Sequence, residues 1–227
     1  MSGLRDETRQ YVQRRLQTTR TPEVLFAIVE TAAENANTQV AQSPERPLHA
    51  CAAGCTSCCY LPVDITAPEA LRMVAYLRQH VSPASLAALR TRLAATAERV
   101  RHLSYEDHTQ ARIPCALLID GTCAAYACRP FACRAWNSTS RASCEDIFEH
   151  GDPVRMLPPL DLSAYEAVWQ IALGLRDGLK QRRLDGATYE LHSILQRALE
   201  MPTITERWLQ HEEVFAGCLM GAFGTET

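Results

Sequence analysis

Residues 49–66 read HACAAGCTSCCYLPVDIT and residues 113–136 read IPCALLIDGTCAAYACRPFACRAW, and these two stretches decide how the chain folds. Together with Cys144 they hold nine of the ten cysteines, and Cys218 lies far from them. Neither stretch has the apolar spacing of an amphipathic helix. Metal-bound thiolates can order loop segments that have too little apolar surface of their own. The pattern therefore predicts a centre that is organised by cysteine-bound metal.

Outside these stretches the sequence shows repeated helix start signals. Thr21, Pro22 and Glu23 combine an N-cap residue, a first-turn proline and an acid that suits the helix dipole, and an apolar stripe follows them. That helix should end near Ser43 and Pro44. Similar signals predict helices that begin at residues 66–69, 82–83, 163–166 and 203–206, with another through 191–198. The helices that begin at 66 and 82 are expected to form a helical hairpin.

The helical period fails between residues 104 and 159, where Gly, Pro, Cys and aromatic residues replace it. Within this irregular segment, residues 116–125 predict a short strand pair that turns at Asp120 and Gly121. We therefore expect a mainly α fold, with helices from both termini packed around an irregular cysteine-rich metal-binding centre and at most a short hairpin. The expected organisation is an N-terminal helical segment (1–48), a cysteine-cluster domain that includes a helical hairpin (49–150) and a C-terminal helical segment (151–227), joined in one compact unit.

Composition narrows the possible function classes. The chain has 227 residues, of which 47% are hydrophobic and 22% charged, and its net charge is -3, so general disorder is excluded and no broad attraction to nucleic acid or anionic membranes is expected. Residues 1–10 show no secretory signal, and the uncharged interval 47–63 contains prolines and cysteines that suit a membrane span poorly. We expect a cytoplasmic protein, where stable disulfides are rare.

The two quoted stretches and Cys144 resemble the zinc- or iron-chelating CxxCxxCC cysteine-cluster family over about residues 51–148. The resemblance is carried by the clustered cysteines, by the proline before Cys115, by the Cys-x-x-Tyr-x-x-Arg-Pro run at 123–130 and by Cys133-Arg134. It implies eight metal ligands, Cys51, Cys55, Cys58, Cys59, Cys115, Cys123, Cys133 and Cys144. Cys128 and Cys218 fall outside this set. The family is distantly similar to flagellin lysine methylases, which are larger proteins.

The clustered cysteines fall into a first block (residues 51–59) and a second block (residues 115–144). The spacing of the first block favours an iron–sulfur cluster over zinc. Cys55-x2-Cys58 is a zinc-type pair, but the remaining spacings do not form two regular zinc ribbons. Cys51-x3-Cys55-x2-Cys58 can bind three irons of a [4Fe-4S] cluster, with the fourth ligand from the second block. Zinc is the alternative cofactor, and two four-thiolate sites are equally compatible with eight cysteines. In each case the two blocks must meet in space.

Other side chains are candidates for cofactor binding. Arg129, Arg134 and Trp136 lie within the second block, and cationic donors near thiolates offset the charge of a cluster. Packing is an equal alternative for these three. Among the seven histidines, only His49 and His150 are placed by sequence to reach the cluster.

Two further functions remain open beside metal binding. The spacing of the first block also matches radical SAM enzymes, but the chain lacks their strand–helix alternation. The enzyme alternative is implied by the resemblance to flagellin lysine methylases: a methyltransferase that uses S-adenosylmethionine on protein lysine, although no Gly-rich nucleotide loop is present. The third possibility is a zinc-stabilised adaptor whose terminal helices bind a protein partner. No catalytic residue is assigned by the sequence.

Overall fold

The computed structural model describes residues 2–52 and 54–219, and the fold is mainly α-helical as predicted. The helices are α1 (Ser2–Thr18), α2 (Pro22–Gln42), α3 (Ala67–His80), α4 (Pro83–Val100), α5 (Tyr105–Ala111), α6 (Phe131–Ala135), α7 (Arg141–Glu149), α8 (Leu162–Gln181), α9 (Leu191–Glu200) and α10 (Ile204–Leu209). Three short 3₁₀ turns cover Arg46–Leu48, Ser57–Tyr60 and Tyr126–Cys128. No helix within the described residues has both the length and the apolar character that a membrane crossing needs.

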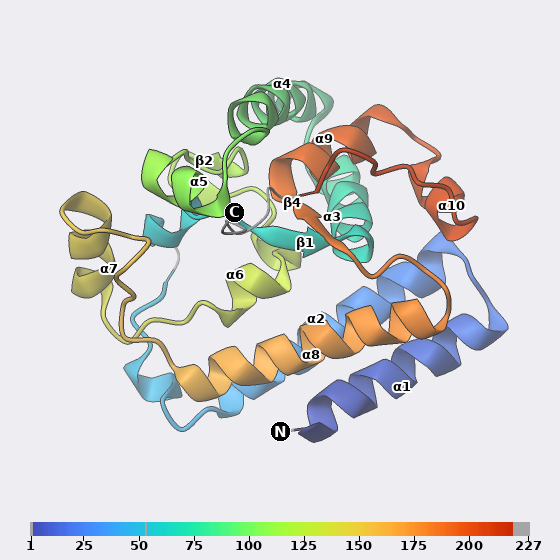
Figure 1. Cartoon of the computed structure of the whole chain (residues 1–227), viewed down its shortest axis with the longest axis horizontal. Helices are drawn as coiled ribbons and strands as arrows, with labels where there is room; N and C mark the ends of the chain where they lie inside the picture. Colours follow the sequence, from blue (N-terminus) through green and yellow to red (C-terminus); the bar gives the residue numbers. More distant parts are fainter. Residues whose placement is uncertain (1, 53, 220–227) are drawn as a thin grey trace, which may run out of the picture.

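Helices α1, α2 and α8 lie side by side and form one layer of the molecule (Figure 1). The approach of α1 to α8 depends on two glycines of α8. A Cβ atom on Gly174 would stand 2.4 Å from the carbonyl oxygen of Arg5, and one on Gly178 would stand 2.5 Å from Cβ of Val12. Since real Cβ atoms do not come this close, only glycine permits this helix packing at either position.

The second layer is formed by α3, α4 and α9 (Figure 1). Helices α3 and α4 follow each other in the chain, but both pack chiefly against α9 rather than against each other. The two helices of the expected hairpin therefore pack on α9, a helix from the C-terminal part of the chain, more than on each other. The buried core runs continuously through both layers, from Leu25 and Leu71 to Leu175 and Leu195.

Most predicted helix starts are confirmed by their caps. The Thr21 side chain accepts a hydrogen bond from the backbone N–H of Val24 at 3.4 Å, and α2 ends at Gln42, next to the predicted stop. Thr66 and Glu69 form the expected capping box. The start predicted at residues 163–166 is wrong by a few residues, because Asp161 is the N-cap of α8 and accepts from the N–H of Ala164 at 2.9 Å.

Two small antiparallel sheets are present in the described part of the chain, where only one hairpin was expected. The predicted hairpin is confirmed as β2 (Leu118–Ile119) and β3 (Thr122–Cys123), with Asp120 and Gly121 in the left-handed conformation at its turn. The second sheet pairs β1 (Asp64–Thr66) with β4 (Thr188–Glu190). It ties the end of the first cysteine block to the C-terminal helices.

The segment from 104 to 159 is more regular than predicted. It contains the short helices α5, α6 and α7 beside the β2–β3 hairpin. Polar caps replace an apolar stripe here: the Ser104 side chain accepts from the N–H of Asp107 at 3.0 Å, and the Ser140 side chain accepts from the N–H of Ser143 at 3.1 Å. Each helix is short enough to form with little apolar periodicity, which is why the sequence pattern did not indicate it.

Candidate metal centre

The two cysteine blocks meet in space, as the spacing predicted. The backbone N–H of Cys115 donates to the carbonyl oxygen of Cys59 at 2.8 Å, which joins the blocks directly. A second join lies at the other end of the first block, where the N–H of Ala50 donates to the carbonyl of Ser138 at 2.9 Å. The N–H of Ser138 in turn donates to Sγ of Cys51 at 3.2 Å. Two separate stretches of chain therefore form one cysteine-rich region.

A buried glutamate places the second block against the helical layers. Oε2 of Glu69 accepts from the N–H of Thr66 at 3.0 Å, and Oε1 accepts from the N–H of Phe131 at 2.9 Å. Burial raises the pKa of Glu69, while these hydrogen bonds and the charge of Arg134 oppose that shift. One side chain thus caps α3 and also fixes the start of α6, the helix that carries Cys133.

Four cysteines form what we call the inner group: Cys59, Cys115, Cys123 and Cys133. Burial raises the pKa of the Cys133 thiol far above its usual range, and the charges of Cys115, Cys123 and Cys59 raise it further. Burial, opposed by a backbone hydrogen bond at Ala125, raises the pKa of Cys123 to about 11, with contributions from Cys115 and Cys59. The charges of these thiols therefore act on one another and disfavour their joint ionisation.

Three cysteines form the outer group: Cys51, Cys55 and Cys144. Burial raises the pKa of Cys51, the hydrogen bond from Ser138 opposes this, and the charges of Cys55 and Cys144 add to it. The pKa of Cys144 is also raised by burial, with a contribution from Cys55. Like the inner group, the outer group draws on both blocks of sequence.

Cys58 lies between the two groups. Its thiol is hydrogen-bonded to Cys59, and this bond together with burial raises the pKa of Cys58, to which the charges of Cys59, Cys133 and Cys51 also contribute. The same hydrogen bond lowers the pKa of Cys59 to about 7 against the effect of burial. Cys58 can therefore complete either group but not both at once.

The three predicted cofactor-binding residues differ in their surroundings. The charge of Arg129 lowers the pKa of Cys51, Cys123 and Cys133, so it favours thiolates in both groups, and its guanidinium also lies 4.2 Å from the ring centroid of Tyr126. Arg134 is buried and donates to the carbonyls of Arg129 and Ala127, each at 2.9 Å, and to Oδ1 of Asn37 at 2.7 Å. Arg134 thus fixes the loop before α6 onto α2.

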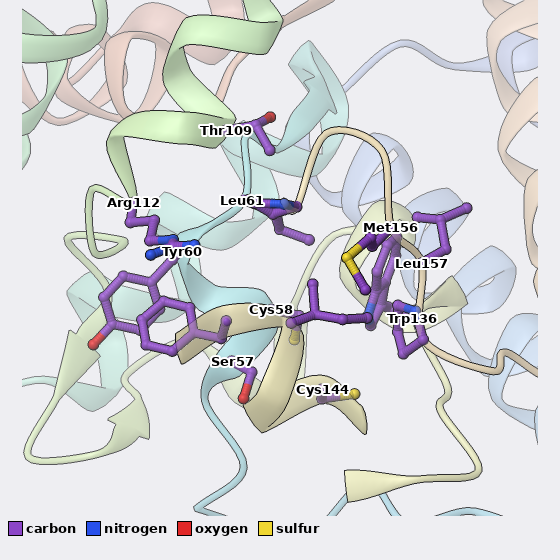
Figure 2. A pocket seen from close by; sticks show the side chains of 14 residues that line it. Ser57, Cys58, Tyr60, Leu61, Thr109, Arg112, Trp136, Cys144, Met156 and Leu157 are labelled. Carbon is purple, nitrogen blue, oxygen red and sulfur yellow. The ribbon is translucent and has the colours of Figure 1, made fainter. Parts of the chain in front are cut away.

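Trp136 lies beside the cysteine groups but carries no charge that could offset theirs. Sγ of Cys51 donates to its carbonyl oxygen at 3.8 Å, and its side chain borders two cavities next to Cys58. One of these cavities is mainly apolar and is formed largely by α7 and the loop after it, with Cys58 and Cys144 at its edge (Figure 2). The rings of Tyr60 and Phe148 pack there with centroids 4.5 Å apart.

Cys128 and Cys218 are separated from the two groups to different degrees. Burial raises the pKa of Cys128 to about 11; the charges of Arg72 and Arg134 oppose this, and Cys123 is the one cysteine that contributes. Cys218 is buried, and its Sγ donates to the carbonyl of Ser193 at 3.6 Å. Cys218 lies in a non-helical segment after α10.

Neither predicted histidine contacts a cysteine. Nε2 of His49 lies 2.8 Å from Oδ2 of the buried Asp161, and the exposed His150 lies 3.6 Å from the carboxylate of Glu149. The histidine that the sequence did not indicate is His192 on α9. Its Nδ1 lies 2.6 Å from Oε1 of Glu190, and its ring is hydrogen-bonded to Cys115.

His192 orders the inner group from the side of the C-terminal helices. Burial lowers the pKa of His192, and the neighbouring Cys115 and Glu190 raise it. The backbone N–H of Ala116 donates to its Nε2 at 3.2 Å, so Nδ1 carries the ring proton and donates to Glu190. A histidine held by a carboxylate and directed at a thiol is a typical outer-shell arrangement around a metal ligand. No motif links His192 to the cysteines, so only the fold reveals it.

The donor set suits a soft metal, although the sulfurs do not converge on one point. Within residues 2–52 and 54–219, no three His, Cys, Asp or Glu side chains take up an arrangement that would hold a metal ion. All ten cysteines are free thiols. Thiolates are the preferred ligands of zinc and of iron–sulfur clusters, and a cysteine changes its direction by one rotation about χ1. The residues therefore fit such a group in kind and in neighbourhood.

Comparisons with known proteins return no match of any kind. No family model, no curated protein and no solved structure matches the chain. The resemblance to the cysteine-cluster family therefore stays a prediction, and the function has to be argued from the residues themselves.

Proposed function

We propose that this protein binds metal through its eight clustered cysteines, as an iron–sulfur cluster in first place and as zinc in second. The observation that carries the proposal is the meeting of residues 51–59 with residues 115–144 in one cysteine-rich region, where the N–H of Cys115 donates to the carbonyl oxygen of Cys59 and the N–H of Ser138 donates to Sγ of Cys51. Burial and mutual repulsion disfavour thiolates in both groups. A bound cation removes this cost, because it deprotonates the thiols that coordinate it.

The grouping favours two sites of four thiolates. The inner group has four cysteines without Cys58, and the outer group reaches four when Cys58 joins it. Each set then takes ligands from both blocks, which explains why neither block alone has a regular metal-binding spacing. Arg129 would offset the charge of both sets, and His192 would orient Cys115.

A reducing compartment suits this proposal. The eight clustered cysteines are free thiols, which would form disulfides under oxidising conditions, whereas metal would compete for them in the cytosol. We therefore propose a cytoplasmic location.

Anaerobic purification with metal and sulfide analysis tests the proposal. A brown protein with acid-labile sulfide indicates an iron–sulfur cluster, and a colourless protein with stoichiometric zinc indicates the second form. Cys133→Ser and Cys55→Ser should each remove about half of the metal, since each breaks one four-thiolate set. Cys218→Ser is the matched control and should leave the metal content unchanged. A protein that is purified without iron or zinc, and that takes up neither after reconstitution, would contradict the proposal.

A further inference from the structure

A cavity of about 240 Å³ lies beside the candidate metal centre and is lined by residues of α5, α6, α8 and the start of β1. Cys58 and Cys133 form one of its walls. The cavity is smaller than the range of about 300 to 1,000 Å³ that is usual for drug-sized ligands. It therefore suits a small molecule or a single chemical group.

Aromatic rings form much of the remaining wall. Tyr165 and Trp169 stand one turn apart on α8, with ring centroids 6.1 Å apart in an edge-to-face arrangement. Trp136 follows α6, and Tyr105 opens α5. All four side chains are only half-buried, although they surround an interior space. Several rings from three separate helices thus border one cavity.

The cavity has one acidic side chain and two buried polar atoms that lack a hydrogen-bond partner within residues 2–52 and 54–219. Among the described residues that line it, Asp64 is the one with a carboxylate, and no Arg, Lys or His is present. Oδ1 of Asp64 and Nε1 of Trp169 are both buried, and neither has a hydrogen-bond partner in the described part of the chain. Burial raises the pKa of Asp64, the charge of Arg176 opposes this, and Glu190 adds to it. A cation in the cavity would remove this cost.

Aromatic faces with one carboxylate are the usual environment for an organic ammonium ion. The ring faces attract the cation through their quadrupoles, and the carboxylate supplies the opposite charge. A neutral ligand would leave the Asp64 carboxylate unpaired, and an anion would be repelled by it. We propose that this cavity binds a small organic ammonium ion next to the metal centre.

The proposal does not depend on metal binding, because the rings and Asp64 belong to other residues than the cysteine groups. If the cysteines hold metal, the bound ion lies against the wall formed by Cys58 and Cys133, which would place it next to a reactive centre. Metal content and ammonium binding can therefore be measured on the same samples and can fail separately.

Isothermal titration calorimetry with choline and butylammonium tests the cavity on the whole chain as purified. Saturable binding of either ion is expected. The neutral isostere of choline, 3,3-dimethyl-1-butanol, should bind at least about tenfold more weakly. Asp64→Asn should weaken binding of the cation by about tenfold or more, and Tyr165→Leu should weaken it severalfold.

Asp120→Asn is the matched control, since it removes the same charge from the exposed turn between β2 and β3. It should leave binding unchanged. Asp64→Asn should fold normally, because it replaces a carboxylate that has an unsatisfied oxygen, and thermal unfolding with metal analysis checks this. The proposal is overturned if neither ion binds, if the neutral isostere binds as well as choline, or if folded Asp64→Asn binds as tightly as the parent protein.

Discussion

Single side chains fix the cysteine region onto the helices, and several of them do so through buried charge. Glu69 joins the starts of α3 and α6, Arg134 joins the loop before α6 to α2, and Asp161 joins α8 to the chain before the first cysteine block. The clustered cysteines could be identified as candidate metal ligands from the sequence, because clustered thiols are rare outside metal sites. It did not predict His192 or Asp64, because each acquires its role only from neighbours that are distant in sequence.

Asp161 offers a test at the residue scale. Burial opposes its ionisation, but hydrogen bonds from the N–H of Ala164 and from the side chains of Ser43, His49 and Ser163 lower its pKa to about 2. A lowered pKa in the folded state means that this carboxylate stabilises the fold above its unfolded pKa and that the contribution is lost as the pH falls towards 2.

Asparagine can still cap α8, but Asp161→Asn removes the charge that these hydrogen bonds stabilise, so it should lower the free energy of unfolding at neutral pH by about 1.5 to 3 kcal/mol, the general range for hydrogen bonds to charged groups. Urea unfolding at several pH values measures this. The difference between parent and variant should narrow as the pH falls from about 5 to about 3. A difference that stays constant over this range would show that the Asp161 charge does not contribute.

At the scale of elements, the sequence predicted features that depend on local contacts and missed features that depend on long-range contacts. The caps at Thr21 and Thr66 are visible in the sequence because each depends on residues within one helical turn. The start of α8 was misplaced because Asp161 and Ser163 are both acceptable N-caps, and tertiary contacts with His49 and Ser43 favour Asp161. The pairing of β1 with β4 could not be predicted, since each strand has only three residues and the packing of α3 and α9 brings them together.

The contact between α1 and α8 can be tested at its glycines. Alanine normally favours a helix over glycine by about 1 kcal/mol. At Gly178, however, the new Cβ would lie 2.5 Å from Cβ of Val12 and 3.0 Å from the carbonyl oxygen of Arg9. Overpacking of this kind costs about 1 to 3 kcal/mol, so Gly178→Ala should lower the free energy of unfolding.

Gly3→Ala is the control for this substitution. Its Cβ would meet nothing closer than the Glu7 side chain at 3.6 Å, so this variant should be neutral or more stable by up to about 1 kcal/mol. Thermal or urea unfolding of both variants measures these changes in stability. Equal stability gains at both positions would mean that α1 does not pack on α8 as closely as described.

At the scale of the whole molecule, the helical layers and the cysteine-rich region are stabilised mainly by different interactions. Helices α1, α2, α8, α3 and α9 bury most of a continuous apolar core, to which residues 104–159 add Ala116, Leu117, Ala125, Phe131 and Ala135. The rest of residues 104–159 is held by short capped helices, single side chains and the proposed metal. A ligand that binds only the folded state adds about 4 kcal/mol of stability at a thousandfold excess over Kd. Metal could thus decide whether this region is ordered while the core persists without it.

Hydrogen exchange with and without a chelator tests this separation. Removal of metal should increase exchange strongly in residues 104–159 and in the first cysteine block, and should change it little in α2 and α8, where apolar burial provides the stability. Uniform loss of protection across the chain would show instead that the metal stabilises the entire fold.

The central claim is that these cysteines are metal ligands, and X-ray absorption at the edge of the bound metal measures this most directly. The account predicts a coordination shell made of sulfur, with metal–sulfur distances of about 2.3 Å, which loses intensity in Cys133→Ser and Cys55→Ser but not in Cys218→Ser. A shell of nitrogen or oxygen atoms, or a spectrum that none of the cysteine substitutions changes, would contradict it.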